Sequence, residues 1–152
     1  MTPMNDPHQA TAEVSGQELT ALLHARGQRA TPQRLVILRE LRRRGEHSSA
    51  DELRRSIQAE LPGTSVPTVY ATLDLLVELG LARRVDAGSG PALYDPRVDP
   101  HHHMICRHCG RVEDLDQSVD AEPLLEAASD HGFAGESVDV VVSGMCSSCA
   151  GS

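Results

Sequence analysis

Aromatic residues are almost absent from this chain. Of its 152 residues, one is Phe, two are Tyr and none is Trp. Single-stranded nucleic acids and sugars bind on platforms of aromatic rings, so the composition excludes both binding modes. The core must therefore be built from aliphatic side chains.

Lysine is absent, so all 14 basic residues are Arg and keep their charge across physiological pH. The sequence also lacks any apolar run of 18 residues, and its N-terminus lacks the basic-then-apolar pattern of a signal peptide. We therefore expect a cytoplasmic protein.

Cysteine occurs only four times, in two C-x-x-C motifs that are separated by 36 residues. The motifs are Cys106-Arg107-His108-Cys109 and Cys146-Ser147-Ser148-Cys149. Two thiolates three residues apart on a tight turn can bind one ion, and two such turns supply the four ligands of a structural Zn(II) site. Two disulfides or a redox-active pair are the alternatives, and nothing else in the sequence indicates an oxidising compartment.

Charge is divided unevenly along the chain. Residues 1–90 carry eleven Arg and eleven acidic residues, whereas residues 91–152 carry three Arg and eleven acidic residues, a net charge of −8. Basic residues concentrate at Arg26, Arg29, Arg34, Arg39, Arg42, Arg43 and Arg44. This segment is suited to phosphates, and we expect Arg29 and Arg34 to contact DNA. The alternative is a solvated basic helix face.

Four short helices are predicted after residues 1–14, whose polar composition predicts a disordered tail. Ser15 and Ser49 each open a capping box, and Thr31 precedes a proline at a helix start. Glycines end the helices. The expected helices span residues 15–27, 31–45, 49–63 and 65–80.

Two β-type stretches, at 81–85 and 92–94, flank a loop of hairpin composition. Helices followed by a hairpin predict a winged helix, in which the last helix before the wing enters the DNA major groove. The residues expected to face bases and phosphates are Pro67, Thr68, Tyr70, Ala71 and Thr72. For Tyr70 the alternative is a core residue with its hydroxyl at the surface.

The last third predicts a small α/β unit. Strands are expected at 104–107, 111–115 and 137–142, with a helix at 122–131. The alternation of valines in the last strand is typical of a half-buried strand. A sheet of about three strands has open edges that pair readily with another copy, so a homodimer is expected.

A second group of metal-binding residue types lies beside the cysteines. Its members are Asp95, His101, His102, His103 and Asp114. In an extended segment, His101 and His103 share one face and His102 takes the other. Imidazole and carboxylate ligands favour Fe(II), Mn(II) or Zn(II). The alternative is an accidental, solvated histidine turn.

Together these motifs resemble the ferric uptake regulator (Fur) family of metal-dependent transcription factors. The resemblance spans residues 15–150 and rests on four segments in the family's order. They are Arg29-Ala30-Thr31-Pro32-Gln33-Arg34, His47-Ser48-Ser49-Ala50-Asp51-Glu52-Leu53, Thr68-Val69-Tyr70-Ala71-Thr72-Leu73 and His101-His102-His103-Met104-Ile105-Cys106-Arg107-His108-Cys109-Gly110. One departure is Ala71, where many members have Arg.

The resemblance implies an α+β protein with a winged-helix DNA-binding domain at 15–95 and a dimerisation domain at 96–152 that holds the four-cysteine zinc. It implies a repressor that binds double-stranded DNA at a palindromic, A/T-rich operator. The regulatory metal, Fe(II) or Mn(II), would be bound by His47, Asp95, His101, His103 and Asp114.

Within the family, the chain is most similar to the peroxide-sensing branch. Iron-uptake members typically have Glu at the positions of Asp95 and Asp114, and zinc-sensing members place a cysteine among the sensing ligands. In the peroxide-sensing branch, Fe(II) promotes oxidation of a ligand histidine, here His47 or His101. An Fe(II)- or Mn(II)-responsive uptake repressor without peroxide chemistry is the alternative.

Two hypotheses place the chain in other classes of protein. Two histidines and one carboxylate could form the facial triad of a non-haem iron oxygenase, although five protein ligands would nearly saturate the ion. A zinc-ribbon interaction module would leave the Arg-rich segment and residues 68–73 without a role. We therefore expect a regulator and not an enzyme.

Overall fold

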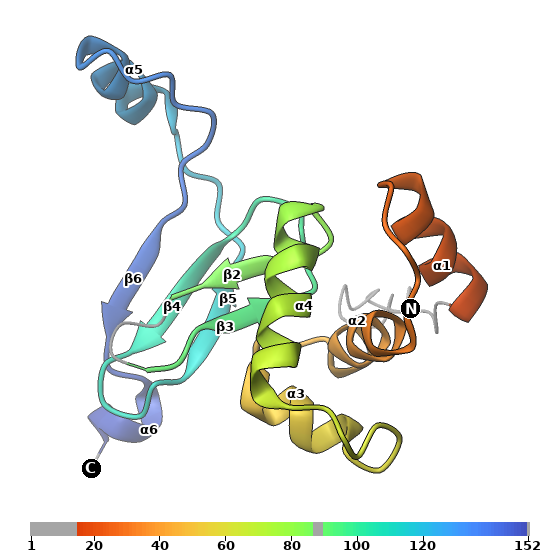
Figure 1. Cartoon of the computed structure of the whole chain (residues 1–152). Coiled ribbons are helices and arrows are strands. Elements are labelled where there is room, and N and C mark those ends of the chain that lie inside the picture. The colour runs from red at the N-terminus through yellow and green to blue at the C-terminus, as the bar shows by residue number, and fades with distance from the viewer. Residues whose placement is uncertain (1–14, 87–89, 152) are drawn as a thin grey trace, which may run out of the picture. The chain divides into compact units, whose positions relative to one another are not determined.

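The computed structural model describes residues 15–86 and 90–151 (Figure 1). It divides into two compact units, the first ending at Val98 and the second beginning at Asp99. The expected disordered tail and the tip of the expected hairpin, residues 87–89, lie outside the described residues.

Local capping signals start the helices of the first unit. Ser15 and Ser49 both form complete capping boxes, while Thr31 and Ser65 cap backbone N–H groups three residues ahead. Gly45 ends the second helix at a φ of 64°, a left-handed conformation that glycine adopts without strain. The helices are α1 (Gly16–Ala25), α2 (Pro32–Arg44), α3 (Ala50–Ile57) and α4 (Val66–Glu78).

The first unit also contains a small antiparallel sheet in the order β1-β3-β2. Its strands are β1 (Ser48–Ser49), β2 (Arg83–Val85) and β3 (Leu93–Asp95). Figure 1 shows α4 beside β2 and β3, which is the helix-then-hairpin arrangement of a winged helix. The core beneath is aliphatic apart from the fully buried Tyr94.

The second unit is a three-stranded sheet with two helices. The strands, in the order β5-β4-β6, are β4 (His102–Cys106), β5 (Val112–Leu115) and β6 (Val141–Gly144). Strand β4 pairs antiparallel with β5 and parallel with β6. The helices are α5 (Glu122–Asp130) and the short α6 (Ser147–Ala150).

Few side chains of the second unit are buried. Ile105 and Cys106 are its buried hydrophobic residues among those described, and no residue of α5 is buried. Leu124, Phe133, Val141, Val142 and Met145 are all more than two-fifths exposed. Since so small a core stabilises a fold poorly, this unit needs a further source of stability such as a metal.

Several expected boundaries are corrected. The third helix ends at Ile57 and not at residue 63. The last strand begins at Val141 because its pairing with β4 sets the register. Val142 is 49% exposed, although the alternation of valines placed it on the buried face of the strand. Strand β1 was not expected, since two residues carry no periodicity. Within the described residues, no helix is long and apolar enough to cross a membrane.

Candidate metal centres and DNA-binding helix

The four cysteines meet because β4 and β6 run parallel. Cys106 ends β4 opposite Gly144 of β6, so the turns that follow the two strands leave the same edge of the sheet. In the first turn, Gly110 at a φ of 76° brings its N–H back to the Cys106 carbonyl. In the second, Cys146 precedes α6 and Cys149 lies within it.

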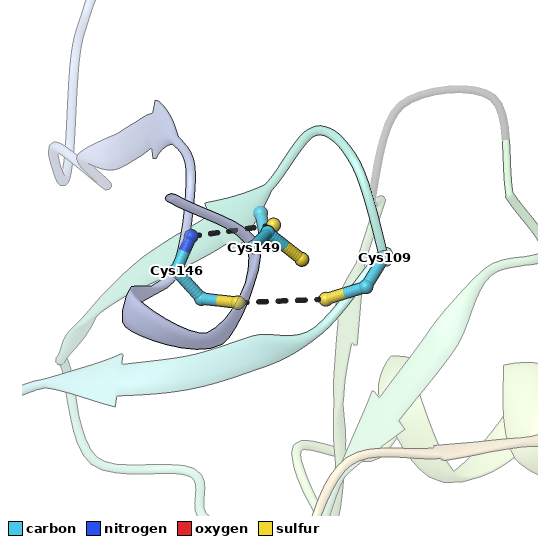
Figure 2. A group of neighbouring side chains, drawn as sticks. Cys109, Cys146 and Cys149 are labelled. Carbon is cyan, nitrogen blue, oxygen red and sulfur yellow. Dashed lines mark hydrogen bonds between the residues drawn. The ribbon is translucent and has the colours of Figure 1, made fainter. Parts of the chain in front are cut away.

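The cluster has the dimensions of one zinc site. Each cysteine offers a sulfur within 4.8 Å of the other three, and the Sγ atoms of Cys109 and Cys146 are 3.8 Å apart (Figure 2). Sulfurs placed about 2.3 Å from one Zn(II) in a tetrahedron would be about 3.8 Å apart. None of the four cysteines forms a disulfide, so the geometry gives no support to that alternative.

Backbone donors prepare this cluster for a cation. The N–H groups of Cys109 and Cys146 donate to the Cys106 sulfur and lower the pKa of that thiol to about 5. The pKa of Cys149 is raised to about 12, chiefly because its thiol hydrogen-bonds with Cys146. Cys106 is therefore a thiolate, while its neighbours oppose ionisation of Cys149, and a bound dication would neutralise the thiolate charge and favour ionisation of the remaining thiols.

A second cluster lies on the sheet of the same unit. His103 and Asp114 are direct partners in the β4–β5 pair, and His101 lies two residues before His103 on the same face. The Oδ1 atom of Asp114 is 3.2 Å from His101 Nε2 and 3.6 Å from His103 Nε2. Both histidines are buried. The structure thus brings together three of the predicted ligands.

The three consecutive histidines point to alternate faces of the extended segment, as its geometry predicts. His101 Nδ1 lies 2.8 Å from the Asp99 carbonyl oxygen, which can only accept, so the neutral ring presents Nε2 as its ligand atom. His102 turns the other way, and its Nδ1 accepts from the Val140 N–H at 3.1 Å. His102 therefore has a role in joining β4 to the segment before β6.

The first unit contributes a separate pair of ligands. His47 immediately precedes β1, and Asp95 ends β3, so the pairing of Ser48 with Tyr94 places His47 beside Asp95. His47 Nε2 is 3.1 Å from Asp95 Oδ2. The Asp95 carboxylate also accepts from the Arg97 N–H through Oδ1, which fixes its orientation.

Arg44 holds the segment that carries His47. Its Nε donates to Ser48 Oγ at 2.8 Å and its Nη1 to Ser56 Oγ at 3.0 Å. This fork joins α2, β1 and α3. The place of Arg44 in the basic segment predicted a phosphate-binding role, and spacing alone gave no signal for its role beside His47.

Both His/Asp groups fit a divalent metal. Ligand atoms about 2.1 Å from one ion and at right angles to each other are about 3.0 Å apart. The separations of 3.1 Å for His47 with Asp95 and 3.2 Å for His101 with Asp114 match this value. With only nitrogen and oxygen donors, the set is suited to Fe(II), Mn(II) or Zn(II).

Helix α4 has one buried and one exposed face. Val69, Thr72, Leu73 and Leu76 are buried, which is the period of a helix packed on a core. Pro67, Thr68 and Ala71 are exposed, and Tyr70 is half-buried with its ring edge-on to Tyr94. Thr72, at 7% exposure, faces the core and not the solvent, which corrects its expected place among the DNA contacts.

Most arginines of the basic segment have partners within the first unit. Arg39 pairs with Glu60, and Arg43 forms two bonds to Glu40. Arg26 donates to the carbonyl of Leu79, while Arg34 donates to that of Arg29. Arg29 itself is exposed and available to a phosphate. The segment is therefore partly a structural network and only partly a basic surface.

A winged helix is a DNA-binding fold, and the thiolate and His/Asp clusters can bind metals. Together they define the class of metal-dependent DNA-binding regulators. Residues 25–143 match the model of the ferric uptake regulator family, and the chain belongs to this family. The expected fold class, a winged-helix domain plus a small α/β domain with clustered cysteines, is confirmed. As a member, the protein is a metal-binding transcriptional repressor.

Relatives with different functions are similar to the chain. Ferric uptake regulation protein 1 of Mycolicibacterium fortuitum is 37% identical over 129 residues, covering 84% of this chain and 80% of that protein. The peroxide-responsive repressor PerR of Staphylococcus aureus is 30% identical over 135 residues, covering 88% and 90%. A zinc uptake regulator complexed with zinc and DNA superposes with a TM-score of 0.66 at 28% identity, covering 90% and 96%.

Proposed function

We propose that this protein is a homodimeric repressor whose affinity for a palindromic, A/T-rich operator depends on a regulatory metal. Zn(II) at Cys106, Cys109, Cys146 and Cys149 stabilises the second unit. DNA lies along the exposed face of α4, at Pro67, Thr68 and Tyr70, with phosphate contacts from Arg29 and Arg34. Such a repressor acts in the cytoplasm, where the operator is.

The observation that carries the proposal is the division of the His/Asp ligands between the two units. His47 and Asp95 belong to the first unit, while His101, His103 and Asp114 belong to the second. An ion bound by both sets fixes the relative orientation of the units. In a two-fold dimer, that orientation decides whether both α4 helices reach successive major grooves. Metal binding and DNA binding are then thermodynamically linked.

The second unit supports a dimer. Its sheet ends in the short strand β6, and the exposed apolar residues Leu124, Phe133, Val141 and Val142 lie in this unit. Strand edges and apolar patches of this kind associate with a matching surface. The solved zinc uptake regulator complexed with DNA supports the same role for the fold.

For the regulatory signal, we propose hydrogen peroxide sensed through Fe(II). Support comes from aspartates at both carboxylate positions and from the similarity to a peroxide-responsive repressor. Bound Fe(II) would activate peroxide for oxygen transfer with no net change in its own oxidation state. One peroxide oxygen would enter a ring C–H bond of His47 or His101, and the other would leave as water. The oxidised ring would be a poorer ligand, so metal affinity and then DNA affinity would fall.

Peptide mass mapping tests this signal. After Fe(II) loading and peroxide exposure, the peptide with His47 or His101 should gain about 16 Da, the mass of one oxygen. Protein loaded with Mn(II) is the control and should gain none at these peptides. Oxidation confined to cysteine or methionine would refute peroxide sensing.

A repressor of metal uptake without peroxide chemistry is the second candidate. It is favoured by the similarity to a ferric uptake regulation protein, at 37% identity. Under this function, Fe(II) protein would keep both histidine peptides unmodified while retaining metal-dependent DNA binding. An enzyme is not proposed, because five protein ligands would leave little room for a substrate at the ion.

A further inference from the structure

Tyr94 lies between the metal ligand Asp95 and the helix proposed to bind DNA. It occupies the middle of β3, the central strand of the first sheet, and its side chain is fully buried. Its hydroxyl donates to Asp74 Oδ1 of α4 at 2.8 Å. Twenty residues separate Tyr94 from Asp74, so this bond joins two distant segments.

The neighbour of Tyr94 on the strand is a metal ligand. Successive residues of a strand point to opposite faces, so Tyr94 is directed to α4 while Asp95 is directed to His47. Asp95 and Tyr94 are adjacent in the backbone of β3, so a shift of this backbone at one residue also shifts the other. A backbone displacement at Asp95 on metal binding would therefore displace the Tyr94 hydroxyl.

On the helix side, Asp74 lies one turn after Tyr70. The rings of Tyr70 and Tyr94 meet edge-on with centroids 6.4 Å apart, so Tyr94 contacts α4 at two successive turns. Asp74 is also 3.9 Å from Arg84 of β2. The contacts from both strands of the hairpin thus converge on one carboxylate.

We propose that the hydrogen bond from Tyr94 to Asp74 is a positioning contact that transmits the state of the metal ligands His47 and Asp95 to α4. This inference rests on the proposed metal-dependent DNA binding. Its physical requirement is that the bond is stronger in the metal-loaded arrangement of β3 than in the metal-free one. Tyr94 and Asp74 are thus positioning residues for the DNA-binding face.

A merely structural bond would behave differently. Losing it would destabilise α4 equally with and without metal, so both DNA affinities would fall by the same factor. A transmitting bond changes their ratio. The ratio of operator affinity with Mn(II) to that without metal therefore separates the two roles.

The test uses the full-length dimer and Tyr94→Phe, which keeps the ring and removes the donor. Asp74 is 56% exposed in its side chain and stays solvated without the bond, so the variant should fold. The affinity ratio should fall about tenfold, and because the bond is stronger in the metal-loaded state, the affinity of the DNA-free protein for Mn(II) should also fall, by at most a similar factor. Asp74→Ala should lower the ratio equally, and the double variant should lower it no further.

Two further variants make the comparison sharper. Asp74→Asn keeps an oxygen acceptor and should retain most of the ratio. Glu60→Gln removes another exposed carboxylate, the partner of Arg39, and should leave the ratio unchanged. Amide hydrogen exchange of α4 is measured on the same proteins without DNA. Mn(II) should slow exchange in α4 of the wild type but not of Tyr94→Phe.

The outcomes distinguish the two proposals. If wild-type affinity rises with Mn(II) and Tyr94→Phe shows the same ratio and the same exchange, the positioning role is wrong and metal-dependent binding stands. If wild-type affinity does not respond to metal, the proposed function is wrong. In that case, amide hydrogen exchange alone tests the positioning role. The role is wrong if Mn(II) slows exchange in α4 of Tyr94→Phe as much as in α4 of the wild type.

Discussion

His103 and Asp114 face each other across the β4–β5 pair, with Nε2 3.6 Å from Oδ1. The register of one hairpin therefore decides which histidine of the three-residue run is a ligand. A shift of one residue would place His102 on the metal-facing side.

This register predicts different effects for adjacent histidines. His103→Ala removes a ligand, so affinity for Mn(II) should fall by about 100-fold or more. His102→Ala should leave that affinity within about threefold and lower stability by about 1 kcal/mol, because the Val140 N–H loses its acceptor. Metal titration and urea denaturation of both variants are the measurements. Equal loss of metal in the two variants would contradict the register.

The four-cysteine cluster should be structural. Cys106→Ser leaves three thiolates, and zinc binding of this kind is coupled to folding by several kcal/mol. Because few residues of the second unit are buried, zinc and dimer should be lost together. Zinc content and molecular mass in solution test this. A Cys106→Ser protein that remains a zinc-loaded dimer would contradict the assignment.

Glu40 should give the first unit a pH-dependent contribution to stability. Two bonds from Arg43 lower the pKa of the 6%-exposed Glu40 below its ordinary value of 4.5. The stabilisation is therefore full above pH 4.5 and is lost as pH falls through the lower folded-state pKa. Glu40→Gln should cost about 1 kcal/mol at pH 7 and much less near pH 3.

The free energy of unfolding of wild type and Glu40→Gln, measured by denaturant titration at both pH values, gives this difference. A cost that stays constant with pH would show that the carboxylate charge contributes nothing. The expected difference in free energy of unfolding is small because Arg43 is exposed and water competes for its guanidinium.

Much of the fold follows from local signals in the sequence. Ser15, Thr31, Ser49 and Ser65 begin helices where their side chains can cap, and these starts were predictable because capping is local. Each C-x-x-C motif is also a local signal, and the presence of two such motifs predicted one four-cysteine cluster. Alternation correctly separated His102 from its neighbours.

Tertiary pairing explains what the sequence could not show. Strand β1 exists only because Ser48 and Ser49 pair with β3, and that pairing is what brings His47 to Asp95. The position of β6 depends on its pairing with β4 and not on the alternation of its own valines. This pairing places Val141 opposite His103, 38 positions earlier in the chain. The bonds of Arg44 to Ser56 and of Tyr94 to Asp74 likewise join segments that local patterns cannot relate.

The central claim is that one metal, bound by ligands from both units, controls DNA affinity. Its most direct test is operator affinity with and without Mn(II), for wild type and His47→Ala, with Mn(II) occupancy measured in parallel. His47→Ala removes one of five ligands and leaves Asp95 as the ligand from the first unit. We predict that Mn(II) raises wild-type affinity at least about tenfold, and that His47→Ala loses this gain while retaining measurable Mn(II). Equal operator affinity of wild type with and without Mn(II), at full occupancy, would contradict the account.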